Sequence, residues 1–146
     1  MSYWDTSALA KLYLAAEDSS AFDAKAAQPG AMLLTARVTV WEFRRVALRK
    51  EVAGDLHTNG AETLWQELES DIAAGWLVIV EPTAQLAQAF DRVMTTCYRH
   101  SPPVPVRTLD GLQFAAARMA GETELVATDK KLREAAVSLG FKLFPV

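Results

Sequence analysis

Short apolar segments alternate with longer helix-like segments along the whole of this chain. Strand character is found at residues 2–4, 32–35, 76–80, 125–127 and 142–144. Strands that are separated by helical crossovers pair in parallel, because parallel neighbours cannot be joined by a tight turn, and their helices then cover both faces of the sheet. The alternation predicts an α/β fold, with three layers (α/β/α) around a mainly parallel central sheet of about five strands.

Helix signals fill the stretches between these strands. The expected helices cover residues 7–14, 17–28, 40–52, 59–74, 84–100, 109–119 and 130–139. Glycines follow several of them, as is usual at helix ends, and the proline-rich segment 101–105 is expected to be a loop. At 146 residues the chain has the size of one domain, and residues 1–146 are expected to form it without internal repeats.

Composition narrows the classes of protein. With 51% hydrophobic and 23% charged residues, the chain resembles globular proteins rather than disordered ones. The apolar run 76–80 is too short to cross a bilayer, and the first residues lack the pattern of a signal peptide, so we expect no membrane association and a cytoplasmic location. The single Cys97 and two histidines do not favour a disulfide or a zinc site.

Four acidic residues, Asp5, Glu42, Asp110 and Asp129, stand where apolar or strand-like segments give way to helices. Each alone has a structural explanation. Asp5 and Asp129 suit helix N-caps, Glu42 would complete a capping box with Thr39, and Asp110 lies in a first turn, where the helix dipole favours negative charge.

Taken together, the four acids indicate one site. The carboxyl ends of neighbouring parallel strands meet at one edge of the sheet, and this brings three of the four acids to a common rim. Clustered carboxylates repel one another unless a cation neutralises them, and oxygen ligands suit Mg²⁺ or Mn²⁺. Such a site is suited to the hydrolysis of a phosphodiester bond.

The net charge of −3 at first disfavours a nucleic-acid partner. If the four acids are metal ligands, however, 14 acidic residues face 15 Lys and Arg in the rest of the chain. The acidity therefore does not exclude RNA or DNA.

Four short motifs give the sequence a family resemblance. YWDTSALAKLY at 3–13 resembles the opening motif of PIN-domain ribonucleases, particularly the VapC-type toxins of type II toxin–antitoxin pairs. The blocks VWEFRRVA at 40–47, TLDGLQFAAA at 108–117 and VATDKKL at 126–132 follow in the order that the family shows. The resemblance extends from Tyr3 to the last strand and implies a PIN-like α/β/α domain.

The resemblance also implies a metal-dependent endoribonuclease, in which Asp5, Glu42, Asp110 and Asp129 hold Mg²⁺ or Mn²⁺. Hydroxyls that support the acids would come from Thr6, Ser7 and Thr128. Similar proteins form homodimers and are silenced by a small antitoxin, so a VapB-like partner is implied. Where many relatives carry Ala and His after the third acid, this chain has Gly111 and Gln113, which bears on the choice of substrate.

Basic and aromatic residues around the acidic motifs have structural explanations as well as functional ones. Candidate contacts to RNA phosphates are Arg107, Lys130 and Arg44, whereas Arg49, Lys50 and Lys131 are expected on solvated helix faces. Trp41 and Trp65 are expected in the core or at a dimer interface, and His57 and His100 at the surface. The loop 101–105 is either a rigid connector or a lip beside Asp110.

Two other functions remain open at the level of sequence. One is a non-enzymatic α/β module, such as a phospho-acceptor receiver or a small-ligand binder; the other is a PIN fold that has lost catalysis and only binds partners. A dinucleotide-binding module is disfavoured because no GxGxxG follows any strand. Transfer, ribosomal and messenger RNA are all compatible with the predicted site.

Overall fold

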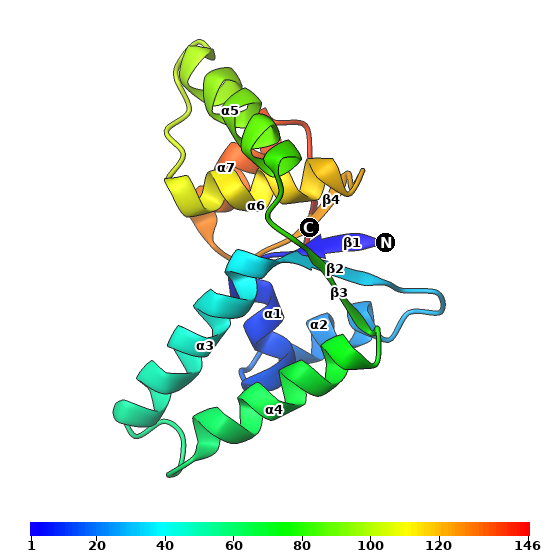
Figure 1. Cartoon of the computed structure of the whole chain (residues 1–146), viewed down its shortest axis with the longest axis vertical. Coiled ribbons are helices and arrows are strands. Elements are labelled where there is room, and N and C mark those ends of the chain that lie inside the picture. The colour runs from blue at the N-terminus through cyan, green and yellow to red at the C-terminus, as the bar shows by residue number, and fades with distance from the viewer.

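A five-stranded sheet forms the centre of the computed structural model, which describes residues 1–146 (Figure 1). Its strands are β1 (Ser2–Trp4), β2 (Leu33–Ala36), β3 (Leu77–Val80), β4 (Glu124–Val126) and β5 (Lys142–Phe144). They lie in the order β3-β2-β1-β4-β5, and every neighbouring pair is parallel. The predicted α/β fold with a parallel sheet is confirmed.

Helices cover both faces of this sheet. One layer contains α1 (Thr6–Tyr13), α2 (Ser19–Ala26), α3 (Arg37–Val52) and α4 (Gly60–Ala73). The opposite layer contains α5 (Ala84–Arg99), α6 (Thr108–Met119) and α7 (Lys130–Ser138), which lie above the sheet in Figure 1. None of these helices combines the length and apolar composition that a membrane span requires.

The strands separate two hydrophobic cores because successive side chains of a strand point to opposite faces. Tyr3 and Leu34 pack in the core beneath α5, α6 and α7, whereas Trp4 and Leu33 pack in the core beside α1 to α4. Tyr3 and Trp4 are both fully buried. The central strand β1 is therefore covered on both faces, as is usual in a parallel sheet.

The start of α3 is the main difference from the predicted boundaries; the other helix and strand ends agree within two residues. Strand β2 leads directly into the helix at Arg37, and Ala36 occupies the N-cap position. Thr39 therefore lies inside the helix, where its hydroxyl donates a hydrogen bond to Oε1 of Gln113 at 2.9 Å. The predicted capping box of Thr39 and Glu42 is wrong.

Gln113 fixes α6 to the sheet by hydrogen bonds inside the core. Its side chain is almost completely buried, and its Oε1 accepts from the hydroxyls of Tyr3 on β1 and Thr39 on α3. Buried polar groups need such partners, because an unsatisfied one costs about 1 to 3 kcal/mol. No buried side-chain nitrogen or oxygen of the protein lacks a partner.

Gly111 allows α6 to pack closely against α5. A Cβ atom at this position would lie 2.7 Å from Sδ of Met94 and 2.9 Å from Cε2 of Phe90. Both distances are shorter than van der Waals contact, so a larger residue would force the side chains of Met94 and Phe90, or the helices that carry them, to shift. The glycine that departs from the family pattern thus has a role in packing.

We expect Gln113→Leu to lower the free energy of unfolding by about 1 to 3 kcal/mol, because it leaves the buried Tyr3 hydroxyl without an acceptor. In the double variant Tyr3→Phe/Gln113→Leu both partners are gone, and the cost should be less than the sum of the two single changes. Urea unfolding measures both quantities. The exposed Gln66→Leu on α4 is the control, and equal costs at positions 66 and 113 would contradict the expectation.

We expect Gly111→Ala to lower the free energy of unfolding by about 1 to 3 kcal/mol, because overpacking at α5 outweighs the better helix propensity of Ala. The cost should shrink in a Met94→Ala background, where the sulfur atom that meets the new methyl group is absent. Chemical denaturation of the four proteins of this cycle provides the test. A more stable Gly111→Ala protein would refute the proposed contact.

Candidate active site

One cleft of about 290 Å³ is lined by all four predicted acids. Asp5 directly follows β1, Glu42 lies on α3 after β2, and Asp129 follows β4. These three strands are neighbours in the order β2-β1-β4, so their carboxyl ends deliver the three side chains to one rim. Asp110 reaches the same cleft from the first turn of α6.

Asp5 is the most deeply buried of the acids, with a relative exposure of 4%. Its Oδ1 accepts a hydrogen bond of 2.9 Å from the backbone N–H of Ala8 and so caps α1. The hydroxyl of Ser7 lies 2.8 Å from both carboxylate oxygens. Burial raises the pKa of Asp5 to about 6 and the charge of Asp129 adds to this, while the hydrogen bonds from Ala8 and Ser7 oppose the shift.

Ser7 also connects the two ends of the cleft. Its Oγ accepts hydrogen bonds from the backbone N–H groups of Thr128 at 2.9 Å and Asp129 at 3.2 Å. Asp129 in turn caps α7, since its Oδ1 accepts from the N–H of Leu132 at 2.9 Å. Thr128 thus takes part through its backbone, and its hydroxyl makes no hydrogen bond to an acid.

Glu42 is held by two side chains from different elements. The Thr6 hydroxyl donates to its Oε2, and Nε2 of Gln113 lies 3.2 Å from the same oxygen. Nε2 of Gln113 also lies 3.4 Å from the Thr6 hydroxyl. Gln113 thus orients Glu42, a role that the sequence did not predict. The sequence signal that could have indicated it is a polar residue within an otherwise apolar helix segment.

Arg107 lines the cleft, and 67% of its side chain is exposed. Its Nε donates to Oδ2 of Asp110 at 2.9 Å, and its Nη2 is 3.8 Å from Oδ2 of Asp129. The hydrogen bond with Asp110 raises the pKa of Arg107, and the charges of Asp129 and Glu42 act in the same direction. The guanidinium thus reduces the repulsion among the acids.

Arg49 is exposed on α3, as the sequence predicted, and it is also a second basic residue that lines the cleft. It lies on α3 seven residues after Glu42, which is two helical turns and therefore the same face. Arg44 instead contacts α4, where its Nη2 is 2.8 Å from Glu62 and its guanidinium lies 5.2 Å from the ring centre of Trp65.

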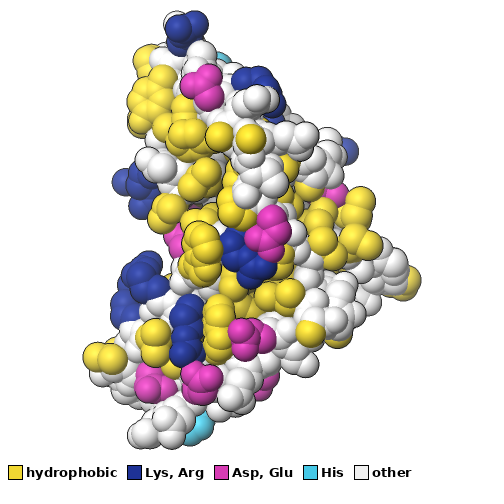
Figure 2. All heavy atoms as spheres, viewed as in Figure 1, with side chains coloured by type: hydrophobic (Ala, Val, Ile, Leu, Met, Phe, Trp, Pro, Cys, Tyr) yellow, Lys and Arg dark blue, Asp and Glu magenta, His cyan; other side chains and the backbone are white.

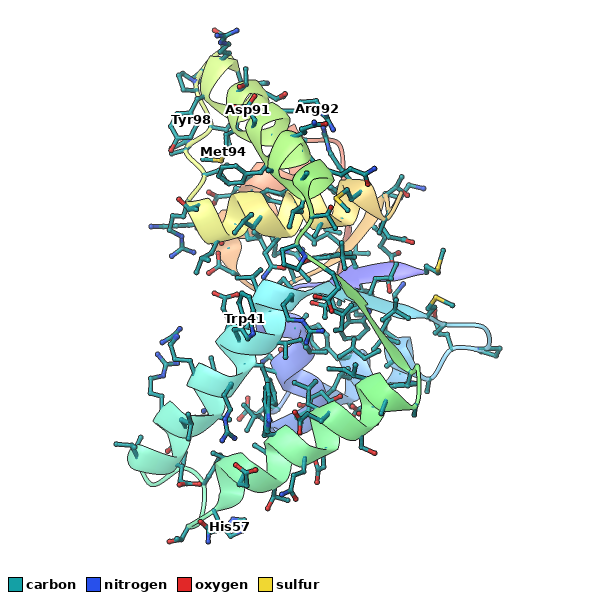
Figure 3. All side chains as sticks on the ribbon, viewed as in Figure 1. Trp41, His57, Asp91, Arg92, Met94 and Tyr98 are labelled. Atoms are coloured by element: carbon teal, nitrogen blue, oxygen red, sulfur yellow. The ribbon has the colours of Figure 1, made fainter.

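The remaining candidates lie outside the cleft. The side chain of Lys130 is 90% exposed and lies 4.0 Å from Glu134. His57 and His100 are exposed, as predicted, and Figure 3 places His57 at the end of the molecule beside α4. Trp65 packs against the core beside α1 to α4, whereas Trp41 is 60% exposed on α3.

The donor set of the cleft fits a hard cation. Its acids supply only oxygen ligands, and the deeply buried Asp5 forms no ion pair with a basic residue. As the side chains stand, no three His, Cys, Asp or Glu groups are close enough to share one metal ion. The oxygen donors suit Mg²⁺ or Mn²⁺ by their chemistry, but the side chains would have to move closer together to share one ion, and Asp110 is paired with Arg107.

Solved structures with similar folds include two proteins of low sequence identity. VapC20 of Mycobacterium tuberculosis, a toxin that cleaves the sarcin–ricin loop, is 20% identical with a TM-score of 0.64, over 92% of this chain and 95% of that one. FitAB, solved bound to an IR36 DNA fragment, is 17% identical with a TM-score of 0.70, over 99% and 94% of the two chains.

Sequence comparison gives a more direct assignment. No protein of curated function matches the chain significantly. The profile of the PIN domain, however, matches residues 2–138, which include all four acids and all seven helices. The chain therefore belongs to the PIN domain family.

Proposed function

We propose that this protein is a metal-dependent endoribonuclease that acts as the toxin of a toxin–antitoxin pair. The observation that carries the proposal is the convergence of Asp5, Glu42, Asp110 and Asp129 on one cleft of a PIN fold. PIN domains are generally nucleases, and the similar VapC20 is an RNA-cleaving toxin.

In this proposal the four acids hold Mg²⁺ or Mn²⁺. A bound ion would polarise a phosphate oxygen and lower the pKa of a water molecule aligned for attack. Ser7 and the N-terminus of α1 hold the Asp5 carboxylate in place, and Thr6 and Gln113 do the same for Glu42. Ligands fixed in this way lose little freedom when the ion binds.

Two arginines would bind the RNA backbone. Arg107 and Arg49 line the same cleft as the acids, and a guanidinium can form two parallel hydrogen bonds to a phosphate. Phosphate contacts position the strand without reading its sequence. Lys130, at the start of α7, is a third candidate at the edge of this region.

The proposed partners are an RNA substrate, a VapB-like antitoxin and a second copy of the chain. Figure 2 shows hydrophobic side chains gathered where the two helical layers meet on one face. An apolar groove of about 280 Å³ with the exposed Trp41 and Leu109 contributes to this face. Such exposed apolar surface is consistent with a homodimer.

The main alternative is a PIN fold that binds partners without cleaving RNA. All four acids are present, and their hydrogen-bond partners are in place, which favours the active form. Cleavage of RNA by the purified protein distinguishes the two.

We expect the purified protein to cleave single-stranded RNA with Mg²⁺ or Mn²⁺ and to stop when EDTA removes the ion. Asp5→Asn should reduce the rate by at least about 100-fold, because the buried metal ligand is lost while Asn still caps α1. Gel analysis of an end-labelled RNA measures the rate. Asp91→Asn, an exposed acid on α5, is the control; metal-independent cleavage, or full activity of Asp5→Asn, would refute the mechanism.

We expect Arg49→Gln and Arg107→Gln each to weaken RNA binding with little change in sequence preference. Each loss should reduce the slope of log affinity against log salt by about 1, since one phosphate contact disappears. Fluorescence anisotropy at several salt concentrations measures this slope. Arg44→Gln on the same helix is the matched control, because Arg44 pairs with Glu62; equal effects at positions 44 and 49 would exclude a specific role for Arg49.

A further inference from the structure

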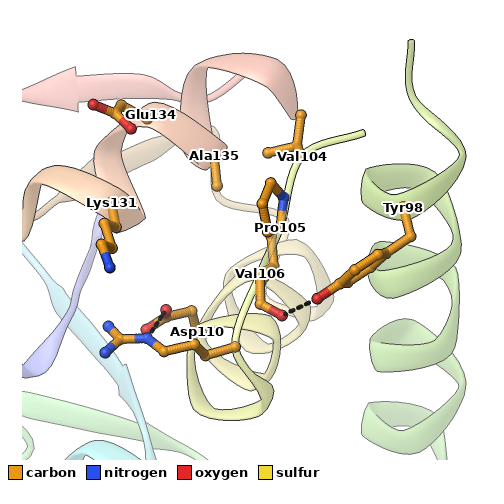
Figure 4. A pocket seen from close by; sticks show the side chains of 9 residues that line it. Tyr98, Val104, Pro105, Val106, Asp110, Lys131, Glu134 and Ala135 are labelled. Carbon is orange, nitrogen blue, oxygen red and sulfur yellow. Dashed lines mark hydrogen bonds and ion pairs between the residues drawn. The ribbon is translucent and has the colours of Figure 1, made fainter. Parts of the chain in front are cut away.

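A second cavity, of about 360 Å³, adjoins the acidic cleft (Figure 4). Its walls come from the end of α5, the loop that precedes α6, and one face of α7. Arg107 and Asp110 line both spaces, so the cavity lies directly beside the acidic cleft. The group next to a phosphate held among the acids would therefore lie near this cavity.

Hydrogen bonds hold the loop wall of this cavity against α5. The Tyr98 hydroxyl donates to the carbonyl oxygen of Val106 at 3.2 Å, as Figure 4 shows. The N–H of Val104 donates to the carbonyl oxygen of Cys97 at 2.9 Å. Prolines in the segment 101–105 further restrict the backbone. The loop is thus a fixed wall beside Asp110. Of the two roles considered for the segment 101–105, this favours one that borders the site over a simple connection between helices.

The lining of the cavity combines apolar and charged groups. Tyr98, Val104 and Pro105 provide an aromatic ring and aliphatic surface, and Tyr98 is 52% exposed. Lys131 and Glu134 lie on the opposite wall, three residues apart on α7 and therefore on one helix face. An aromatic platform with a donor and an acceptor nearby is the combination that proteins use to bind unstacked RNA bases.

Charge and hydrogen-bond chemistry favour one base over the others. Guanine presents two adjacent N–H donors, at N1 and N2, and one carboxylate can accept a hydrogen bond from each. Its O6 can accept a hydrogen bond from an ammonium group. Adenine and cytosine present one amino group beside a ring nitrogen acceptor, and uracil presents one N–H between two carbonyl oxygens; these acceptors and a carboxylate repel each other. Glu134, which also lies 4.0 Å from Lys130, and Lys131 supply the acceptor and the donor that the edge of guanine requires.

We propose that this cavity binds one unstacked guanine of the RNA strand, adjacent to the phosphate held in the acidic cleft. The proposal rests on the proposed function, because it takes RNA as the substrate. Tyr98 and Pro105 contact the plane of the base, Glu134 accepts from N1 and N2, and Lys131 donates to O6. The cavity thereby gives the nuclease a preference for guanine beside the bond that is cut.

Binding to short RNA tests the proposal without cleavage. The probes are four labelled nonamers of uridine whose central base is guanine, adenine, cytosine or uracil, and the protein is full-length Asp5→Asn with Mg²⁺. We expect the guanine probe to bind about tenfold more tightly than the other three, as read by fluorescence anisotropy. Equal affinity for all four probes, or preference for another base, would overturn the proposal.

Substitutions in the lining of the cavity identify the side chains that bind the base. In the same background, Glu134→Gln should reduce the guanine advantage to about twofold or less, because the charged acceptor is lost. Tyr98→Ala should weaken binding of the guanine probe about tenfold, whereas Tyr98→Phe, which keeps the ring but loses the hydrogen bond to Val106, should bind clearly better than Tyr98→Ala. Glu69→Gln on α4 is the matched control. An undiminished guanine advantage in Glu134→Gln would exclude the cavity as the site of recognition.

The binding assay for guanine and the cleavage assay for the proposed nuclease can fail independently of each other. Guanine-selective binding by a protein that cleaves no RNA would support the cavity and refute the nuclease. Metal-dependent cleavage without any guanine preference in the binding assay would support the nuclease and refute the cavity.

Discussion

A carboxylate buried at the end of the central strand is the constraint on which the rest of this structure depends. Asp5 follows β1 directly, and its backbone N–H still pairs with Val126 of β4, so the side chain has little freedom of position. A buried charge is costly unless hydrogen bonds stabilise it. At the start of α1 the backbone N–H of Ala8, which has no partner within the helix, donates such a bond to Asp5. Ser7 then ties the same carboxylate to the start of α7.

Charge balance explains the arrangement around this acid. Asp5, Asp110 and Asp129 lie at the N-termini of α1, α6 and α7, where the helix dipole is favourable for negative charge. Arg107 adds a full positive charge beside two of them. Helix ends and the exposed Arg107 side chain together reduce the repulsion among the acids, while the cleft offers the oxygen ligands that a hard cation prefers.

The sequence predicted the alternation of strands and helices, because burial on both faces makes parallel strands apolar and their crossovers helical. The common position of Asp5, Glu42 and Asp129 could be predicted for the same reason, since parallel topology brings the carboxyl ends of strands together, whereas Asp110 reaches the cleft from the first turn of α6. Local rules failed where tertiary contacts decided the outcome. The hydroxyl of Thr39 has the residue type and spacing of a cap, yet it bonds Gln113, which is 74 residues away. Likewise, only the fold shows that Arg49 lines the acidic cleft whereas Arg44 pairs with Glu62 on α4.

The sheet order has a consequence for the synthesis of the protein. The first strand lies in the middle, and it acquires its β4 neighbour only after most of the chain has been made. Ser7 and Thr128, whose hydrogen bond joins the segments that follow β1 and β4, are 121 residues apart. A growing chain on the ribosome therefore carries Asp5 and Glu42 without the other two acids. The site of the proposed nuclease therefore stays incomplete until the segment that carries Asp129 has been synthesised.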